Sequence, residues 1–283
     1  MKLLPATQFR LEELTEAYNE TRVDYIVPMP MNAARLDEYI HLYDVDLSAS
    51  WVAVNDLHTK LGLAMLGVRD ERAWITRLGV LPAGRRHGIG TALMDGLLQS
   101  AAERELDTIW LEVIKNNIPG HKLFLKYGFT ETRELVVARR PPTSEIRPPE
   151  LLQGVTIKQV STLHRAETLR RMGLRQERPN WLVQTETMRN IPSLSAFLVE
   201  LSDGGRGWVS YAASMFQLTR IYVDVLEGDV PKITAAALLT LHRYNPVQDA
   251  IMENMPAADP RWEGFKAMGY FEAFRRLEMV REP

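Results

Sequence analysis

Apolar residues recur at two different spacings over the first 140 residues, and these spacings predict alternating helices and strands. Helical spacing is found over 9–19, 33–43 and 89–104. A shorter helix over 119–126 begins at Pro119, a residue suited to a first helical turn. Runs rich in β-branched and aromatic residues predict strands at 50–55, 61–68, 73–80, 108–114 and 132–139. The pattern indicates an α+β fold centred on a strand, a loop, a helix and a second strand.

The second half of the chain repeats this pattern. Residues 75–80 read I-T-R-L-G-V and residues 218–223 read L-T-R-I-Y-V, so that Arg77 corresponds to Arg220. The sequence Y-G-F at 127–129 returns as M-G-Y at 268–270, and each half ends in a strand-like stretch. Several matches in the same order indicate a duplicated domain.

A proline-rich segment separates the two halves. Residues 139–150 hold four prolines in twelve positions, which disfavours both helix and central strand and predicts an extended surface segment. We therefore expect one domain over 1–140, a linker over 141–150 and a second domain over 151–283.

Composition and charge exclude several classes of function. With 46% hydrophobic and 25% charged residues the chain is of ordinary globular composition, and its net charge of −2 predicts neither nucleic acid nor membrane as a partner. The absence of Cys excludes disulfides, Cys-ligated zinc, iron–sulfur clusters and thiol catalysis, and no metal is expected. No apolar run approaches the roughly 20 residues of a membrane span, and a signal-peptide core is absent. The sequence therefore predicts a soluble, cytoplasmic protein.

The segment with the clearest chemistry is a Gly/Arg loop between a strand and a helix. Residues 85–90 read R-R-H-G-I-G. Backbone N–H groups at a helix N-terminus lack internal partners, and glycines let a ligand approach them closely, which suits a phosphate group. Arg85 and Arg86 add charged donors. Neither the Gly-Lys-Ser/Thr pattern of nucleotide-binding P-loops nor the G-x-G-x-x-G dinucleotide pattern is present.

This loop resembles the pyrophosphate loop of the GNAT acetyltransferase superfamily, Gln/Arg-x-x-Gly-x-Gly/Ala. A second run, residues 111–129, is similar to the family's later motif, with Asn117 at the end of a strand and Gly128-Phe129 after a short helix. The resemblance implies two tandem GNAT-like domains, each a mixed, splayed β-sheet flanked by helices. It also implies an N-acetyltransferase that binds acetyl-CoA and acetylates a primary amine, most simply that of a small molecule.

Carried over to this sequence, the resemblance implies a set of cofactor-binding residues and one backbone catalytic group. The amides around 85–91 would hold the pyrophosphate, the strand ending at Val80 would pair with the pantetheine arm, and the N–H of Val80 would stabilise the oxyanion. The residues so implied are Leu78, Gly79, Val80, Arg85, Arg86, His87, Gly88, Ile89, Gly90, Thr91, Asn117 and Phe124.

Side chains for proton transfer are less clear. Phe124 stands where the family often has a tyrosine acid, and Tyr127, one helical turn later, is the alternative, although packing in the core beside Phe129 is the favoured interpretation of Tyr127. Glu112 is a candidate base, or else an ordinary surface or salt-bridged carboxylate. His87 is expected to face solvent, and His121 lies near the expected acceptor site.

The second half lacks the anion loop. Its corresponding residues 226–234 contain Glu227 and Asp229 and neither a glycine pair nor an arginine pair, which predicts a degenerate copy that has lost cofactor binding. Two other functions stay open: an acetyl-CoA-binding sensor or scaffold without turnover, and a nucleotide- or phosphosugar-binding domain. Because an internal duplication imitates a dimer, we expect either a monomer or a homodimer.

Overall fold

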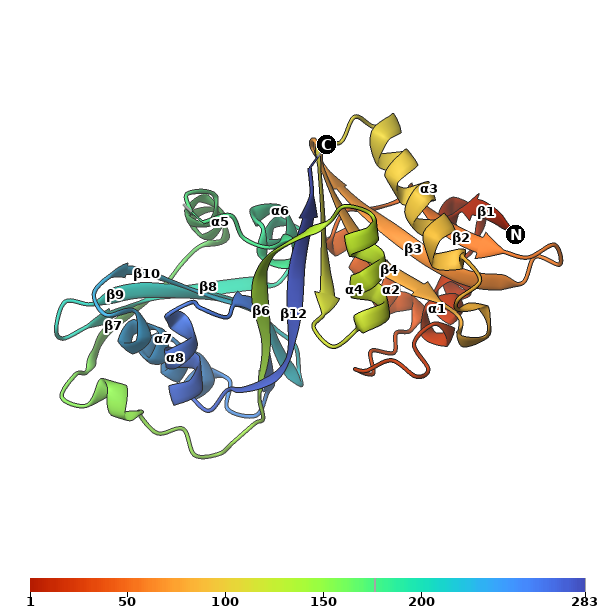
Figure 1. Ribbon diagram of the computed structural model, residues 1–283. Helices are drawn as coiled ribbons and strands as arrows, with labels where there is room; N and C mark the ends of the chain where they lie inside the picture. Colours follow the sequence, from red (N-terminus) through yellow and green to blue (C-terminus); the bar gives the residue numbers. More distant parts are fainter. Residues whose placement is uncertain (176, 283) are drawn as a thin grey trace. The chain divides into compact units, whose positions relative to one another are not determined.

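The computed structural model describes residues 1–175 and 177–282, which divide into two compact units. The first unit contains Met1–Arg133 together with the segment that begins at Leu277, and the second contains Glu134–Arg276 (Figure 1). Each unit is a mixed β-sheet with helices on both faces, as the sequence predicts.

The first unit follows the predicted order of helices and strands, with an added N-terminal strand. Its sheet has the order β1-β2-β3-β4-β5-β12-β6, in which β4 and β5 run parallel and β1 to β4 run antiparallel. The elements are β1 (Lys2–Pro5), α1 (Leu11–Glu20), α2 (Ala33–Leu42), β2 (Val45–Val54), β3 (Lys60–Arg69), β4 (Arg72–Val80), α3 (Ile89–Glu103), β5 (Thr108–Ile114), α4 (Ile118–Lys126) and parts of β6 (Thr130–Arg140) and β12 (Phe271–Arg281).

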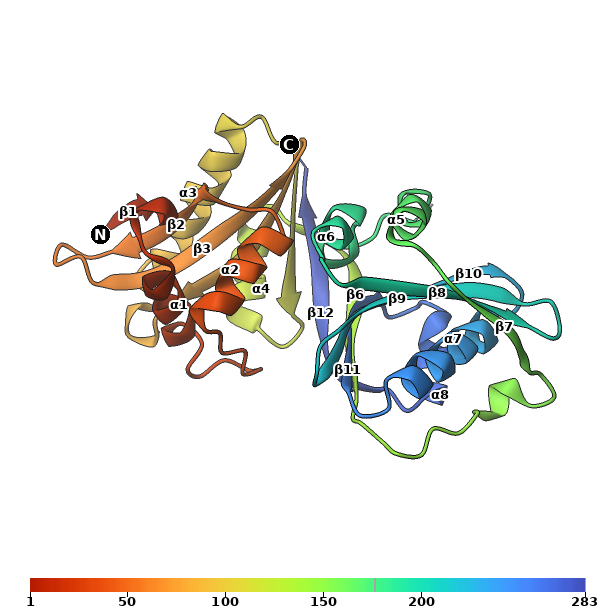
Figure 2. The ribbon, with the colours of Figure 1, turned by 180° about the vertical axis from the view of Figure 1, so that it is seen from behind.

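Helices cover both faces of this sheet. In Figures 1 and 2, α3 and α4 lie on one face and α1 and α2 on the other. The apolar side of α3, including Leu93, Met94 and Leu97, is fully buried against the strands. Phe124 of α4 joins the same core and packs edge-on against Phe129, with ring centroids 6.1 Å apart. The 3.6-residue spacing read from the sequence therefore marks the buried side of each helix.

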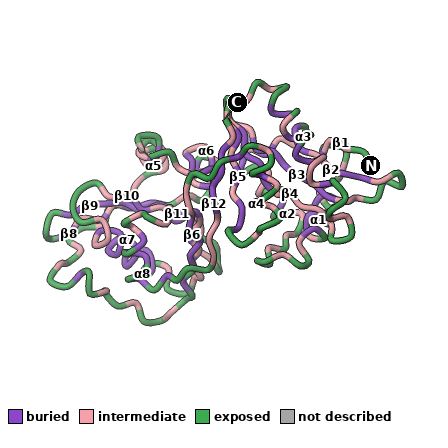
Figure 3. The backbone as a smooth tube through the Cα atoms, viewed as in Figure 1, coloured by how far each residue is buried: buried purple, intermediate pink, exposed green. Residues whose placement is uncertain are grey.

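The second unit has the sheet order β12-β6-β11-β10-β9-β8-β7, with α7 and α8 on one face and α5 and α6 on the other (Figure 1). Its central helix α7 is buried on all sides from Ile233 to His242, which Figure 3 shows as a continuous buried stretch. The elements are β7 (Ile157–Thr162), α5 (Arg165–Gly173), α6 (Thr185–Arg189), β8 (Leu194–Leu201), β9 (Arg206–Ala213), β10 (Gln217–Glu227), α7 (Val230–Tyr244), β11 (Asp249–Pro256) and α8 (Arg261–Ala267).

The two halves exchange their last strands. The apolar residues of 135–138 lie in the second unit, where β6 pairs antiparallel with β11 and Val136 and Ala138 join the core. The apolar residues of 277–280 lie in the first unit, where Leu277 and Met279 join the core. Both segments were predicted to be strands, but the unit each one completes is not visible in its local pattern.

The exchange moves the limits of the compact units away from the proline-rich segment. The sequence suggested domains over 1–140 and 151–283 with a linker at 141–150. The compact units instead divide inside β6, after Arg133, and inside β12, after Arg276. Residues 141–149 have no helix or strand, in keeping with their prolines.

A β-bulge occurs at the same place in both units. Arg77 in β4 has φ +53° and Arg220 in β10 has φ +55°, and the strand register shifts beside each of them. A positive φ is uncommon for a residue with a side chain, and a bulge bends its strand. The repeated I-T-R and L-T-R sequences therefore encode a shared backbone distortion.

Candidate functional site

In the first unit, the two central parallel strands pair over only part of their length. The recorded pairing of β4 with β5 runs from Arg72↔Thr108 to Ile75↔Leu111, although the strands continue to Val80 and Ile114. The bulge at Arg77 begins just beyond the last pair. Residues past this point on each strand are therefore released from the parallel ladder, as expected for a splayed sheet.

The loop after β4 leads into α3 with a run of unpaired backbone donors. Within the described chain, the amides of residues 86–91 make no hydrogen bond of normal geometry to a protein acceptor. The helix begins at Ile89 and its cap residue, Gly88, offers no side chain. Six consecutive N–H groups at the positive end of a fifteen-residue helix form a site for an anion with several oxygens.

The glycines of this segment serve different purposes. Gly88 has φ +80°, a left-handed conformation that favours glycine, and a Cβ there would meet nothing within 4 Å. Gly90 would place a Cβ in ordinary contact with Leu123, 3.4 Å away, so protein packing alone does not require it. A Cβ on Gly79 would lie 2.4 Å from Oγ1 of Thr21, so close packing of α1 on β4 requires that glycine.

The two arginines of the loop lie in different environments. Arg85 donates to both carboxylate oxygens of Asp24, at 2.6 and 2.7 Å, and to the carbonyl of Val80 at 3.2 Å. This pairing raises the pKa of Arg85 and lowers that of Asp24. Arg86 and His87 are exposed, as predicted for the histidine. Both arginines are therefore accessible to solvent, but Arg85 is paired with a carboxylate.

Val80 lies at the free edge of β4. The N–H of Leu81 donates to Leu61 on β3 at 2.9 Å. Since successive amides of a strand point to opposite edges, the N–H of Val80 faces away from β3, toward the side where pairing with β5 has ended. That amide is therefore directed to the open side of the strand.

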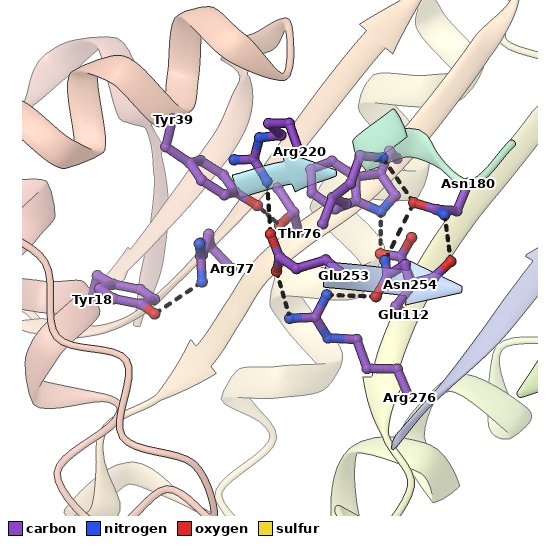
Figure 4. Close-up of polar contacts among 12 residues, drawn as sticks. Tyr18, Tyr39, Thr76, Arg77, Glu112, Asn180, Arg220, Glu253, Asn254 and Arg276 are labelled. Atoms are coloured by element: carbon purple, nitrogen blue, oxygen red, sulfur yellow. Dashed lines mark hydrogen bonds and ion pairs between the residues drawn. The ribbon is translucent and has the colours of Figure 1, made fainter. Parts of the chain in front are cut away.

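A cluster of aromatic and charged side chains surrounds the first residues beyond the split. The guanidinium of Arg77 lies 4.0 Å from the ring centroid of Tyr39 and donates to the hydroxyl of Tyr18 at 2.9 Å (Figure 4). Thr76 shares a hydrogen bond with Tyr39. Burial raises the pKa of the Tyr39 hydroxyl, although the nearby Arg77 partly offsets this effect.

Glu112 belongs to the same cluster. It is the residue after the last β4–β5 pair, and its carboxylate accepts the indole N–H of Trp74 at 2.7 Å. Sequence reasoning identified Glu112 but missed Tyr18, Tyr39 and Trp74. The aromatic residues come from separate elements, and nothing in their local sequence indicates that they converge.

The later motif caps helix α4. The side chain of Asn117 accepts the N–H of Gly120 at 3.2 Å and donates to the hydroxyl of Tyr25 at 3.3 Å. Phe124, seven residues on, is only 7% exposed and belongs to the core. It presents a ring face rather than a proton donor at the position where the family often has tyrosine.

The side chains of Tyr127 and His121 each interact with a carboxylate of the protein. The Tyr127 hydroxyl donates to Asp95 at 2.6 Å and to the carbonyl of Thr91 at 2.9 Å. Burial and the Asp95 carboxylate raise the pKa of Tyr127 to about 12. His121 lies 2.7 Å from Glu131. The Tyr127 hydroxyl and the Nε2 atom of His121 therefore each lie against a carboxylate.

In the second unit, the corresponding strand–helix turn has been closed. Residues 81–88 separate β4 from α3, but only Gly228 and Asp229 separate β10 from α7. The Asp229 carboxylate caps α7 by accepting the N–H of Lys232 at 2.9 Å, and Pro231 has no N–H to offer. The protein's own carboxylate thus occupies the end of the helix.

Among residues 1–175 and 177–282, no group of three or more His, Asp or Glu side chains is arranged to hold a metal ion. In the same residues, no helix combines the length and apolar character needed to cross a bilayer.

Comparison with known proteins agrees with this geometry. Residues 11–129 match the model of the acetyltransferase (GNAT) family. A GCN5-related N-acetyltransferase from Sphaerobacter thermophilus has a TM-score of 0.70 at 17% identity, covering 99% of this chain and 93% of its own. A tandem GNAT protein from the clavulanic acid biosynthesis pathway has a TM-score of 0.65 at 16% identity, covering 99% and 98%. A search of curated proteins gave no significant match. The fold is therefore shared along the whole chain.

Proposed function

We propose that this protein is an acetyl-CoA-dependent N-acetyltransferase acting on a primary amine, because residues 11–129 match the GNAT family model and the chain shares its fold with GNAT structures. The observation that carries the proposal is the run of free amides from Arg86 to Thr91 at the start of α3. A pyrophosphate offers several anionic oxygens, which is the ligand chemistry that such a run of donors accepts best.

The residues beyond the β4–β5 split supply the catalytic roles in this proposal. Acetyl-CoA, when bound, supplies the thioester that the amine attacks. The N–H of Val80 donates to the oxygen on which negative charge develops. Glu112 accepts the proton that the amine releases, directly or through a water molecule. Because the Tyr127 hydroxyl already donates to Asp95, the proposal leaves protonation of the thiolate to water.

The second unit has a structural role in the proposal. The N-terminus of helix α7 is capped by the Asp229 carboxylate, so we expect the second unit to bind no acetyl-CoA. The acceptor is proposed to be a small molecule, because neither the charge nor the composition of the chain points to nucleic acid or membrane. We also propose that the protein is a monomer or a homodimer and that it acts in the cytoplasm.

Calorimetric titration with acetyl-CoA tests the proposal directly. We expect one site per chain. Two sites would contradict the closed turn in the second unit, and absence of binding would contradict the cofactor assignment. A thiol-release assay with a panel of amines then separates an enzyme from an acetyl-CoA-binding sensor, which would bind the cofactor without releasing thiol.

A further inference from the structure

One short segment, residues 21–25, contacts the strand, the anion loop and the capping asparagine of the proposed cofactor site. Asp24 pairs with Arg85 of the anion loop, and the carbonyl of Thr21 accepts from the same guanidinium at 3.4 Å. Arg22 donates to the carbonyl of Leu78 at 3.3 Å, and Tyr25 accepts from Asn117 at 3.3 Å. We call residues 21–25 the strap.

The strap is anchored at its ends and weakly held between them. At one end, Thr21 packs on Gly79 and its hydroxyl donates to the carbonyl of Tyr18 at 2.7 Å. Beyond the other end, Asn19 exchanges hydrogen bonds with Met31 at 2.8 and 3.0 Å. Between these points the Asp24 and Arg85 side chains are 51% and 40% exposed. An ion pair this exposed is weak and readily exchanged.

Asp24 and a bound pyrophosphate would compete for the same cation. Arg85 immediately precedes the run of free amides, and a phosphate accepts the two N–H groups of a guanidinium as well as a carboxylate does. Arg85 lowers the pKa of Asp24, so its carboxylate stays charged at neutral pH and repels a second anion. Binding of an anion therefore favours departure of Asp24.

We propose that Asp24 is a latch: while it holds Arg85 the strap lies closed over the cofactor site, and cofactor binding takes Arg85 from it and releases the strap. This inference rests on the proposed function. Release also frees Asn117 from Tyr25 and Leu78 from Arg22, so that the strand edge and the capping asparagine become accessible together. Binding of the pyrophosphate to the anion loop thereby precedes access of the pantetheine arm to the edge of β4.

The affinity of latch variants for acetyl-CoA tests the first part. Asp24→Asn removes the charge but keeps the shape, and we expect the Kd for acetyl-CoA to fall about fivefold, the upper range for an exposed ion pair. Asp24→Glu keeps the charge and should bind like the wild type. Glu16→Gln is the matched control, because Glu16 lies on α1, just before the strap, and its 2.6 Å ion pair with Lys60 of β3 does not involve the strap. An unchanged or raised Kd in Asp24→Asn would overturn the latch.

Hydrogen exchange of the wild-type protein with and without acetyl-CoA tests the second part. We expect the amides of residues 86–91 to become protected while those of 22–28 exchange faster. Protection of both segments would mean that the strap stays in place when acetyl-CoA binds, and the latch would be rejected. A wild-type protein that binds no acetyl-CoA would instead contradict the proposed function, so the two failures are distinguishable.

Discussion

In each unit an arginine donates to the carbonyl at the corresponding strand position, but the ion pairs of these two arginines differ in exposure. In the first unit Arg85 donates to Val80, and its partner Asp24 is half exposed. In the second unit Arg261 donates at 2.7 Å to Val223, the residue that corresponds to Val80, and its partner Asp259 is only 4% exposed. We call each arginine–aspartate pair a clamp. The first clamp is solvent-exposed, so another anion can replace its aspartate, whereas the second clamp is buried.

The same difference holds at the helix ends. In the first unit eight residues separate β4 from α3, and the first amides of α3 are unpaired. In the second unit two residues separate β10 from α7, and Asp229 caps the helix. The two units therefore keep the same fold with different turns between strand and helix. The second unit has a shorter turn, one capping carboxylate and one buried arginine.

The largest expected effect comes from breaking the buried clamp. Arg261→Ala leaves the Asp259 carboxylate buried without its cation, which typically costs about 3–5 kcal/mol. We expect a large drop in the free energy of unfolding, measured by urea denaturation. Arg85→Ala should change it little, because its partner is solvated. Equal losses in the two variants would show that the two clamps do not differ.

Blocking the anion loop should have the next largest effect. Gly88→Asp places a carboxylate among the free amides, and we expect acetyl-CoA affinity to fall about 100-fold or more, because this negative charge repels the pyrophosphate and competes for its donors. Gly204→Asp is the matched control, because Gly204 also has a positive φ, +89°, with nothing within 4 Å of a Cβ. Calorimetry that found equal affinities would remove the loop from the site.

Removing the cap of α7 should have a moderate effect. Asp229→Ala leaves the N–H of Lys232 without its acceptor, and the expected loss of stability is about 1 kcal/mol. We also expect that this variant still binds a single acetyl-CoA, since the turn stays short. A second site appearing on titration would show that the carboxylate alone closes the second unit.

The smallest effect concerns Tyr127. Its folded-state pKa of about 12 lies above the ordinary value of 10, so its contribution to stability is complete below pH 10 and is lost as pH rises toward 12. Burial also raises the pKa values of Tyr39, Tyr222 and Tyr270, so the difference in ultraviolet absorbance between the wild type and Tyr127→Phe should isolate one tyrosine that ionises near pH 12. The same variant should keep wild-type turnover at neutral pH; a large loss would reinstate Tyr127 as the proton donor.

The sequence predicts much of this comparison because several signals are local. The repeat containing Arg77 and Arg220 marks the shared bulge, and the Gly/Arg loop marks the donor run, since both depend on residues adjacent in the chain. The partners that complete the site were not predictable in this way. Asp24 meets Arg85 and Tyr39 meets Thr76 across tens of residues, and an acidic or aromatic residue in a loop carries no sign of its distant partner.

The exchanged strands have a consequence for synthesis on the ribosome. The first unit needs the segment that begins at Leu277, so its sheet stays incomplete until 143 further residues after Arg133 have been made. At roughly 5–20 residues per second, this delay is about 7–30 s. Throughout it, β5 presents an open edge of the kind that pairs with other chains. During this time the nascent protein is exposed to aggregation through that edge, which two domains folding one after the other would avoid.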